Sequence, residues 1–237
     1  MFKPLKGKKV VDLTSVLAGP YCTYQLALLG AEVIKIENLK DGDWTRLGGK
    51  DKELVNKSMG TSFLVQNSDK KSIQIDLKSS KGKNIALKLI KNADVFVENM
   101  TPGKAEKLGL GWQDISKLNS KIIYCSISAF GQDGPFKDRG AYDHVVQAMS
   151  GIMTTTGTKE SGPTKVGAAY IDYSTGLNAA FAIVSALHHI KQSNKAIRLD
   201  VAMLDTSLLL MANMVTEHLN SGWIPTQMGN EAQSGSP

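Results

Sequence analysis

The residues best suited to chemistry lie in one stretch, residues 164–190, which read TKVGAAYIDYSTGLNAAFAIVSALHHI. In this stretch an apolar run ends in a single carboxylate, Asp172, and a long apolar helical pattern follows it. A carboxylate can act as a nucleophile and form a covalent acyl intermediate. Small residues around Asp172 would leave room for a bulky group; they are Ala168, Ala169, Ser174, Thr175 and Gly176.

Asp172 also has a purely structural interpretation. An aspartate before a helix is a common N-cap, because its side chain accepts a backbone N–H of the first turn. Both interpretations use the same geometry. The dipole at a helix N-terminus holds a carboxylate ionised, and the end of a strand in an open α/β sheet is where substrates bind. The residues of this stretch alone leave both interpretations open.

The net charge favours an anionic partner. The 237 residues carry a formal charge of +6, with a pI near 9.1. The 28 Lys and Arg residues are scattered, with no basic stripe interleaved with aromatic residues, so a phosphate-bearing small molecule is favoured over nucleic acid. Basic residues in loops or at the ends of predicted elements, a subset of which would converge on phosphates, are Arg46, Lys70, Lys71, Lys78, Lys107 and Arg139.

Several other kinds of site lack their sequence signals. The four histidines have no metal-ligand spacing, so no metal site is predicted; they are His144, His188, His189 and His218. Neither a GxSxG elbow nor a GxGxxG turn occurs. Cys22 and Cys125 form no CxxC motif and are predicted to be reduced and buried. Without a signal peptide or a transmembrane-length apolar run, we expect a cytoplasmic protein with no membrane partner.

Strand and helix patterns alternate along the chain. Strands are predicted at residues 8–13, 32–37, 72–77, 94–98, 121–128, 166–171 and 197–201. Helices are predicted at residues 20–29, 79–92, 102–108, 112–118, 141–153, 173–191 and 204–221, with a long loop at 38–63 that has room for one short helix. This alternation favours an α/β fold with a doubly wound parallel sheet. We assign residues 1–222 to one large domain and residues 223–237, rich in Gly, Ser and Gln, to a linker.

An ordered series of motifs, together with the Asp172 segment, resembles the class III CoA-transferases, the family of formyl-CoA transferase and the alpha-methylacyl-CoA racemases. The series covers nearly all of residues 10–222. It runs VVDLTSVLAGPYCTYQLALLGAEVIKIE (10–37), GDWTR (42–46), NSDKKSIQIDLKSSKGK (67–83), ADVFVENMTPGKAEKLGLGW (93–112), FGQDGPF (130–136) and GAYDHVVQAMSG (140–151).

The resemblance implies a Rossmann-like CoA-binding domain and a homodimer whose subunits are interlinked like chain rings. It implies transfer of CoA from an acyl-CoA donor to a free carboxylic acid, with Asp172 matching the family's nucleophilic aspartate. The implied intermediates are an aspartyl anhydride and an aspartyl-CoA thioester. No metal or prosthetic group is needed, because each step exchanges one activated acyl group for another.

The resemblance also implies a set of CoA contacts. They are Leu17, Ala18, Asn38, Ile75, Asp76, Leu77, Lys78, Asn99, Met100, Thr101, Lys107, Arg139, Gly140, Ala141 and Tyr142. Two of them depart from the formyl-CoA transferase pattern, which has Gln at the position of Leu17 and a basic residue at that of Asn38. This difference argues against formyl and oxalyl groups as the substrate pair.

Two alternatives are considered beside the transferase. Racemases of this family carry a His–Asp pair, with the His where this chain has Tyr142; His144 lies two residues further on, so acyl-CoA epimerisation is disfavoured. The other alternative is a non-catalytic CoA-binding fragment. The family pattern continues into a second domain and a C-terminal return segment beyond this chain, so a separate C-terminal half is a further expected partner.

Overall fold

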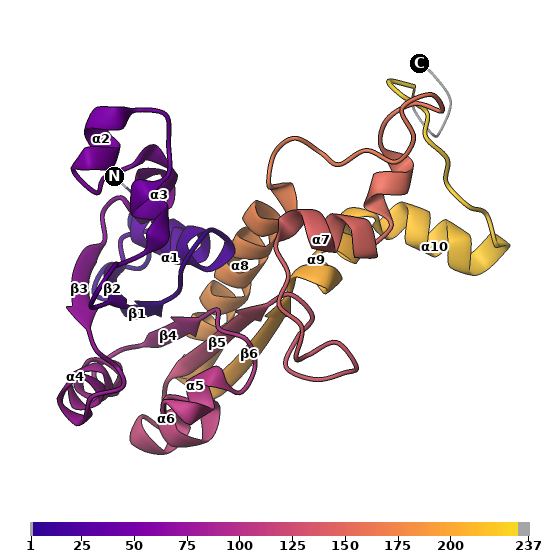
Figure 1. Cartoon of the computed structure of the whole chain (residues 1–237). Helices are drawn as coiled ribbons and strands as arrows, with labels where there is room; N and C mark the ends of the chain where they lie inside the picture. Colours follow the sequence, from indigo (N-terminus) through magenta and orange to yellow (C-terminus); the bar gives the residue numbers. More distant parts are fainter. Residues whose placement is uncertain (1, 232–237) are drawn as a thin grey trace.

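The computed structural model describes residues 2–231, with the backbone alone at residue 191. It contains a parallel sheet of six strands with helices on both faces (Figure 1), which confirms the predicted α/β fold. The strands are β1 Lys9–Leu13, β2 Glu32–Asn38, β3 Lys71–Ile75, β4 Val95–Glu98, β5 Ile123–Ser128 and β6 Ile197–Ala202.

The strand order is β3-β2-β1-β4-β5-β6. Strands β2 and β3 are added on one side of β1 and strands β4 to β6 on the other, so the order of addition changes side between β1 and β4. There Val10 of β1 is in register with Val33 of β2 on one side and with Val95 of β4 on the other. The chain leaves β1 toward one face of the sheet and leaves β4 toward the other. A crevice therefore opens at the carboxyl ends of β1 and β4, which is the usual ligand site of such sheets.

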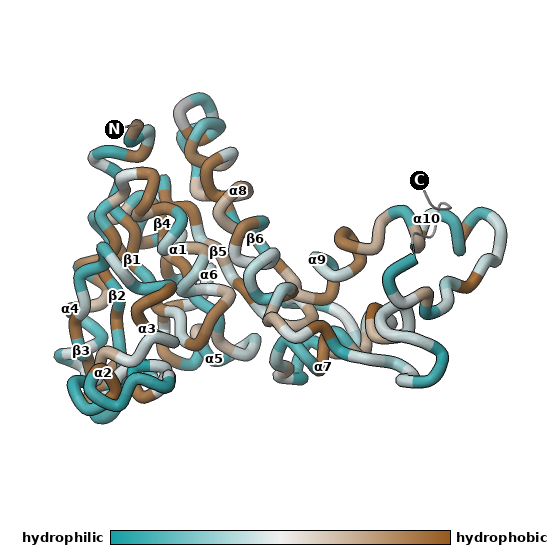
Figure 2. Tube along the Cα trace, turned by 90° about the horizontal axis from the view of Figure 1, so that it is seen from above, coloured by the Kyte–Doolittle hydropathy of each residue, from teal (hydrophilic) through white to brown (hydrophobic). Residues whose placement is uncertain are grey.

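The helices form two layers and one outlying group. Helices α1 (Ala18–Leu28) and α8 (Tyr170–Ser193) cover one face of the sheet, while α4 (Ser80–Lys91), α5 (Lys104–Lys107) and α6 (Trp112–Leu118) lie on the other (Figure 1). Helices α7 (Asp143–Met149), α9 (Met203–Leu210) and α10 (Ala212–Ser221) extend away from the sheet (Figures 1 and 2). The short elements are η1 Trp44–Leu47, α2 Lys52–Asn56, α3 Thr61–Asn67 and η2 Ile152–Thr155.

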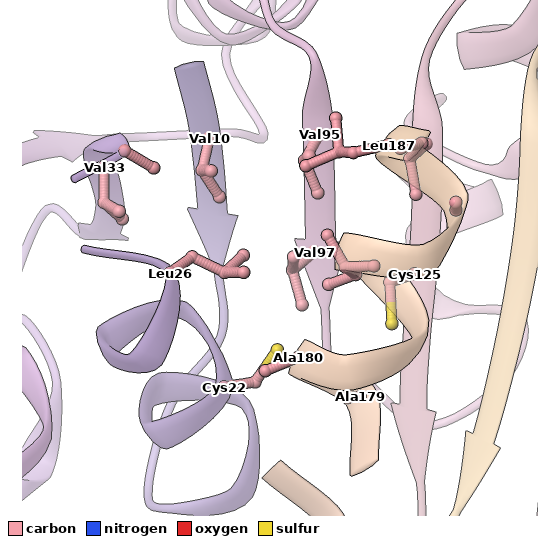
Figure 3. Close-up of a cluster of buried hydrophobic side chains, with 14 of the residues drawn as sticks. Val10, Cys22, Leu26, Val33, Val95, Val97, Cys125, Ala179, Ala180 and Leu187 are labelled. Atoms are coloured by element: carbon pink, nitrogen blue, oxygen red, sulfur yellow. The ribbon is translucent and has the colours of Figure 1, made fainter. Parts of the chain in front are cut away.

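Alternation along the strands builds a core on each side of the sheet. In β1, Val10 packs toward α1 and α8, whereas Val11 packs toward α4 and α6. This follows from the two-residue period of a strand, in which successive side chains point to opposite faces. Figure 3 shows the first core, where Cys22 of α1 and Cys125 of β5 lie among valine and alanine side chains. Both cysteines are free and buried, as predicted.

Three predicted elements differ from the structure. Residues 166–171 form no strand: residues 164–169 are irregular, and α8 already begins at Tyr170. The Val166 N–H bonds to the side chain of Gln147, not to a strand, and β5 pairs with β6. The predicted loop 38–63 contains η1 and α2 and the start of α3, and the predicted helix 204–221 is divided at Met211.

The predicted linker, residues 223–237, lies partly outside the described residues. Residues 223–231 contain neither helix nor strand. They run back along the loop after η2, where the Gly229 N–H donates to the carbonyl of Gly157 (2.8 Å) and the Gln227 amide donates to the carbonyl of Thr156 (3.2 Å). The division into a domain of residues 1–222 and a linker stays a prediction.

Candidate active site

Asp172 stands in the wall of a pocket of about 450 Å³ at the carboxyl ends of β1, β4 and β5. Residues from the loop after β1, the loop after β4 and the segment before α7 form the other walls. The predicted contact residues that share this pocket with Asp172 are Leu17, Ala18, Asn99, Met100, Thr101, Arg139, Gly140, Ala141 and Tyr142. Tertiary structure thus gathers residues that are up to 155 positions apart, since Leu17 and Asp172 line one cavity.

A second pocket, of about 750 Å³, adjoins the first along the ends of β2, β3 and β4. The two pockets share the lining residues Ser15, Asn99, Met100 and Thr101. The predicted contacts Asn38, Ile75, Asp76, Leu77 and Lys78 line the second pocket. Lys107 is not among the lining residues of either pocket. Lys104, at the other end of the same short helix, takes its place in the second pocket.

The loop after β1 is held in an unusual conformation where the two pockets meet. Val16 has φ 74°, a left-handed conformation that a β-branched residue avoids unless its surroundings impose it. Asn99 imposes part of it, because its side chain accepts from the Ser15 N–H (2.9 Å) and donates to the Ser15 carbonyl (2.8 Å). Gln66 of α3 donates to the Val16 carbonyl (2.8 Å). Sequence reasoning missed Ser15 and Gln66, because neither belongs to a periodic pattern.

Close packing of α8 against α1 places Asp172 beside this loop. Gly176 lies against the start of α1, and a Cβ atom there would stand 2.7 Å from the Ala18 carbonyl oxygen. Asp172 is one helical turn before Gly176 and therefore faces the same loop. The smallness of Gly176 serves helix packing, and Thr175 is buried with its hydroxyl donating to the Ile171 carbonyl. The expectation that these small residues make room for a ligand is wrong at both positions.

Asp172 is not the N-cap of its helix. The cap position is Ala169, which offers no side-chain hydrogen bond, and Asp172 lies inside the first turn. The carboxylate of Asp143, the first residue of α7, accepts instead from the Ile171 N–H (2.9 Å) and the Asp172 N–H (3.1 Å). The cap prediction therefore failed because a residue distant in sequence satisfies these backbone donors.

The electrostatics of Asp172 also differ from expectation. Burial, and then the nearby charge of Asp143, raise the pKa of Asp172 from 3.8 to about 7. The expected effect of a helix dipole was a fully ionised carboxylate. Among residues 2–231 no salt bridge involves Asp172, so no bound cation offsets its loss of hydration.

Five of the six candidate basic residues fall into two groups; Lys107, the sixth, is neither paired with a carboxylate among the described residues nor part of a pocket wall. Three are already paired with carboxylates: Arg46 with Glu37 (2.6 Å), Lys70 with Asp12 (3.0 Å) and Lys71 with Glu32 (2.6 Å). Two line the pockets: Lys78 the second and Arg139 the first. The Arg139 guanidinium also lies over the ring of Phe136, 5.0 Å from its centroid.

Comparison with known proteins assigns the family. The sequence model of CoA-transferase family III matches residues 5–237. The chain belongs to CoA-transferase family III. This membership confirms the resemblance carried by the ordered motifs.

Named family III relatives cover the whole chain. A succinate–glutarate CoA-transferase of Agrobacterium fabrum is 39% identical over 239 residues, which is 99% of this chain and 59% of that protein. A formyl-CoA:oxalate CoA-transferase of Afipia carboxidovorans is 42% identical over 89% of this chain and 49% of its own length. The chain therefore spans about half to three fifths of the length of these relatives.

A solved structure gives the same answer for the fold. The crystal structure of a CaiB/BaiF family protein from Brucella suis has a TM-score of 0.90 and 38% identity, and covers 97% of this chain and 61% of its own. Within the described part of this chain, no helix is long and apolar enough to cross a membrane.

The position that distinguishes racemases within the family holds Tyr142. Its side chain lines the first pocket, is largely exposed and stacks on His144 with ring centroids 6.4 Å apart. His144 is exposed and is not among the residues lining either pocket. The His144 imidazole therefore lies outside the pocket wall that contains Asp172, as expected from its position two residues after Tyr142.

Proposed function

We propose that this chain carries the CoA-binding domain and the nucleophile of a CoA-transferase that moves CoA from an acyl-CoA donor to a free carboxylic acid. One observation carries the proposal: in a family III chain, Asp172 is a half-buried carboxylate in the wall of the smaller pocket, with no salt-bridge partner among the described residues. Family membership alone supports CoA transfer. The position of Asp172 supports the route.

The proposed reaction is a series of acyl exchanges at Asp172. Its carboxylate attacks the donor thioester carbonyl; the C–S bond breaks, CoA thiolate leaves and an aspartyl anhydride remains. The thiolate then attacks the aspartyl carbonyl, which releases the donor acid and leaves an aspartyl-CoA thioester. The acceptor carboxylate attacks that thioester and expels the thiolate again. The thiolate finally attacks the acceptor carbonyl, which forms the new acyl-CoA and frees Asp172.

A raised pKa suits this role. With a pKa of about 7, Asp172 is ionised in a large fraction of molecules at neutral pH. Its anion is poorly hydrated, because burial is the main cause of the shift. A poorly hydrated anion attacks a carbonyl more readily than one that must first shed bound water, and a pKa near the working pH is typical of catalytic groups.

The two pockets suggest how CoA lies. We place the thioester end in the pocket that contains Asp172 and the nucleotide end in the larger one. Lys78 and Lys104 line the larger pocket and would face phosphates there. The shared residues Asn99, Met100 and Thr101 would contact the connecting chain. Among the predicted contacts, Lys107 is not supported by its position.

The substrate class follows from the relatives and from one residue. The compared relatives are named for succinate–glutarate and formyl-CoA:oxalate transfer. Leu17 places an apolar side chain in the pocket, where the formyl-CoA transferase pattern has Gln. We therefore propose a small carboxylic acid acceptor larger than oxalate. The proposed assembly is a homodimer, with a separate chain supplying the C-terminal half as an alternative, and no metal or prosthetic group takes part.

The test is to trap the enzyme-bound acyl group. The protein is incubated with succinyl-CoA and hydroxylamine and then digested for mass spectrometry, with Asp172→Asn as the control. We expect a hydroxamate on Asp172 that is absent from the variant. The measurement is repeated with glutaryl-CoA and acetyl-CoA, and with the C-terminal portion of a longer relative added. If no condition labels Asp172, the proposed nucleophile is wrong.

Two further measurements separate the alternatives. Deuterium exchange at the α-carbon of a 2-methylacyl-CoA, without acyl transfer, would indicate an epimerase. Unchanged CoA affinity in Asp172→Ala by calorimetry, with no turnover in any combination, would indicate a non-catalytic CoA-binding chain. The transferase predicts that labelled glutarate is converted to glutaryl-CoA at the expense of the donor acyl-CoA, with no exchange of α-protons.

A further inference from the structure

The carboxylate of Asp143 joins two helices at the point where Asp172 is placed. One of its oxygens, Oδ2, accepts both the Ile171 N–H (2.9 Å) and the Asp172 N–H (3.1 Å). These donors belong to the first turn of α8, where backbone N–H groups have no partner within the helix. Asp143 comes from α7, so α8 is capped from outside by a residue 28 positions earlier.

Gln147 fixes the other side of this carboxylate. Its amide nitrogen donates to Asp143 Oδ1, and its amide oxygen accepts the Val166 N–H (2.9 Å). Asp143 and Gln147 are buried, with exposed fractions of 6% and 1%, so water does not compete for these bonds. The loop before α8, the first turn of α8 and α7 are thereby tied together by one pair of side chains.

Apolar packing supports the same joint. Val146 of α7 and Ile171 of α8 are fully buried and belong to one cluster with Ala129 and Met203. The cluster lies beside the pocket, since Ala129 and Met203 also line it. A shift of α7 relative to α8 would therefore break both the hydrogen bonds and the packing, and would move the backbone of Asp172.

We propose that Asp143 is a positioning residue for Asp172: its carboxylate pins the backbone of the reacting residue and, with Gln147, fixes where that side chain stands in the pocket. The proposal rests on the proposed function of Asp172. Asp143 does not line either pocket, so its effect on the reaction passes through Asp172.

Asp143 has a second effect on Asp172 through its charge. It is the second cause, after burial, of the raised pKa of Asp172. Besides Asp143 of α7, the titratable groups near Asp172 are Tyr170 and Tyr173 of α8, Tyr21 of α1, and Arg139 and Tyr142 of the segment before α7; of these groups, Asp143 is the one that shifts the pKa of Asp172. Removal of the Asp143 charge should lower the pKa of Asp172.

The chain offers a matched set of variants. Asp143→Asn removes the charge and sets an amide donor against the donating nitrogen of Gln147. The double variant Asp143→Asn/Gln147→Glu restores every bond: the new amide nitrogen donates to the new carboxylate, whose other oxygen accepts the Val166 N–H. It returns the negative charge one helical turn further along α7. The effect of the hydrogen bonds of Asp143 and the effect of its charge can therefore be measured separately.

Two readouts are used. Hydroxamate formation at saturating succinyl-CoA, measured against pH, should fall about 10- to 100-fold in its plateau in Asp143→Asn and recover to within about threefold of the parent in the double variant. Carbon-13 NMR of labelled aspartate carboxyls, with Asp172→Asn for assignment, should show the Asp172 midpoint lower by about one pH unit in Asp143→Asn.

The outcomes are distinguishable. The proposal is overturned if a folded Asp143→Asn has the same plateau rate of hydroxamate formation and the same NMR midpoint as the parent. It is also overturned if the double variant melts like the parent but forms hydroxamate as slowly as Asp143→Asn. A cap with only a structural role would lower the melting temperature and leave the midpoint in place. If the parent protein forms no hydroxamate, the proposed function fails, whereas the NMR comparison still decides whether Asp143 controls Asp172.

Discussion

Two carboxylates of this molecule, the buried Asp12 and the half-buried Asp172, show opposite behaviour. Asp12 of β1 is fully buried, and its carboxylate accepts from Lys70 (3.0 Å) and from the Thr23 hydroxyl (2.7 Å). Burial by itself would raise its pKa, but Lys70, Lys35 and two threonine hydroxyls overcome that effect and lower the pKa to about 2. Asp12 therefore stays ionised, and its charge is balanced by these partners in the protein interior.

Asp172 experiences burial without such partners. Its neighbour is another carboxylate, Asp143, and its pKa rises to about 7. The same residue type is therefore a paired anion in the interior of the sheet and a titratable carboxyl group in the pocket wall. Burial pushes both carboxyl groups toward the neutral form, and the sign of the neighbouring charge decides the result. Four measurements would break or sharpen this comparison.

The largest expected effect is on chemistry at Asp172. Asp172→Asn removes the proposed nucleophile and keeps the shape, so acyl-group trapping and CoA transfer should fall by at least about a thousandfold. Conversion of radiolabelled glutarate to glutaryl-CoA in the presence of succinyl-CoA measures this loss. Retention of more than a tenth of the activity by a correctly folded variant would place the nucleophile elsewhere.

The second effect is on stability, at the contrasting carboxylate. Asp12→Asn leaves Lys70 buried without its counter-charge, which should lower the free energy of unfolding by about 3–5 kcal/mol. The loss should be larger at pH 6 than at pH 9. The pKa of Lys70 is already lowered to about 8 and would fall further without Asp12, so its charge is costly only at lower pH. Urea unfolding at the two pH values measures both quantities.

The third effect is the pH dependence of stability that Asp172 itself causes. Because its pKa is about 7 in the folded protein and ordinarily 3.8, stability is lost as pH rises from about 4 to 7 and stays lower above that range. Asp172→Asn lacks this loss. Allowing for partial exposure, it should be more stable than the parent at pH 8 by about 1–3 kcal/mol, with no advantage at pH 4. A constant difference between the two proteins across this range would contradict the raised pKa.

The smallest effect is expected at an exposed pair. Lys71 and Glu32 form a salt bridge of 2.6 Å, but their side chains are 72% and 43% exposed. Lys71→Ala should therefore cause at most a small change in the urea concentration at half-unfolding and leave transfer activity unchanged. Added salt should remove even this difference. A loss comparable to that of Asp12→Asn would mean that partners and burial do not separate the two kinds of ion pair.

The sequence by itself determined the fold class and the family. Alternating strand and helix patterns are local, because side-chain periodicity follows directly from backbone geometry. The β1, β4 and β5 patterns led to a parallel sheet, and the ordered motifs from residue 10 to the Asp172 segment led to family III, which the comparison confirms. The apolar run before Asp172 was misassigned as a strand, because a short apolar segment fits either period.

Only the tertiary structure decided the chemistry of Asp172. Its cap comes from Asp143, its contact with the loop after β1 comes from Gly176 against α1, and its pKa comes from burial and a neighbour on another helix. Likewise, only long-range pairing separates Lys70, which is committed to Asp12, from Lys78, which lines a pocket. Charge interactions and desolvation depend on which groups meet in space. Two residues of the same type can therefore have similar sequence surroundings, and one is paired in the interior while the other lines a pocket.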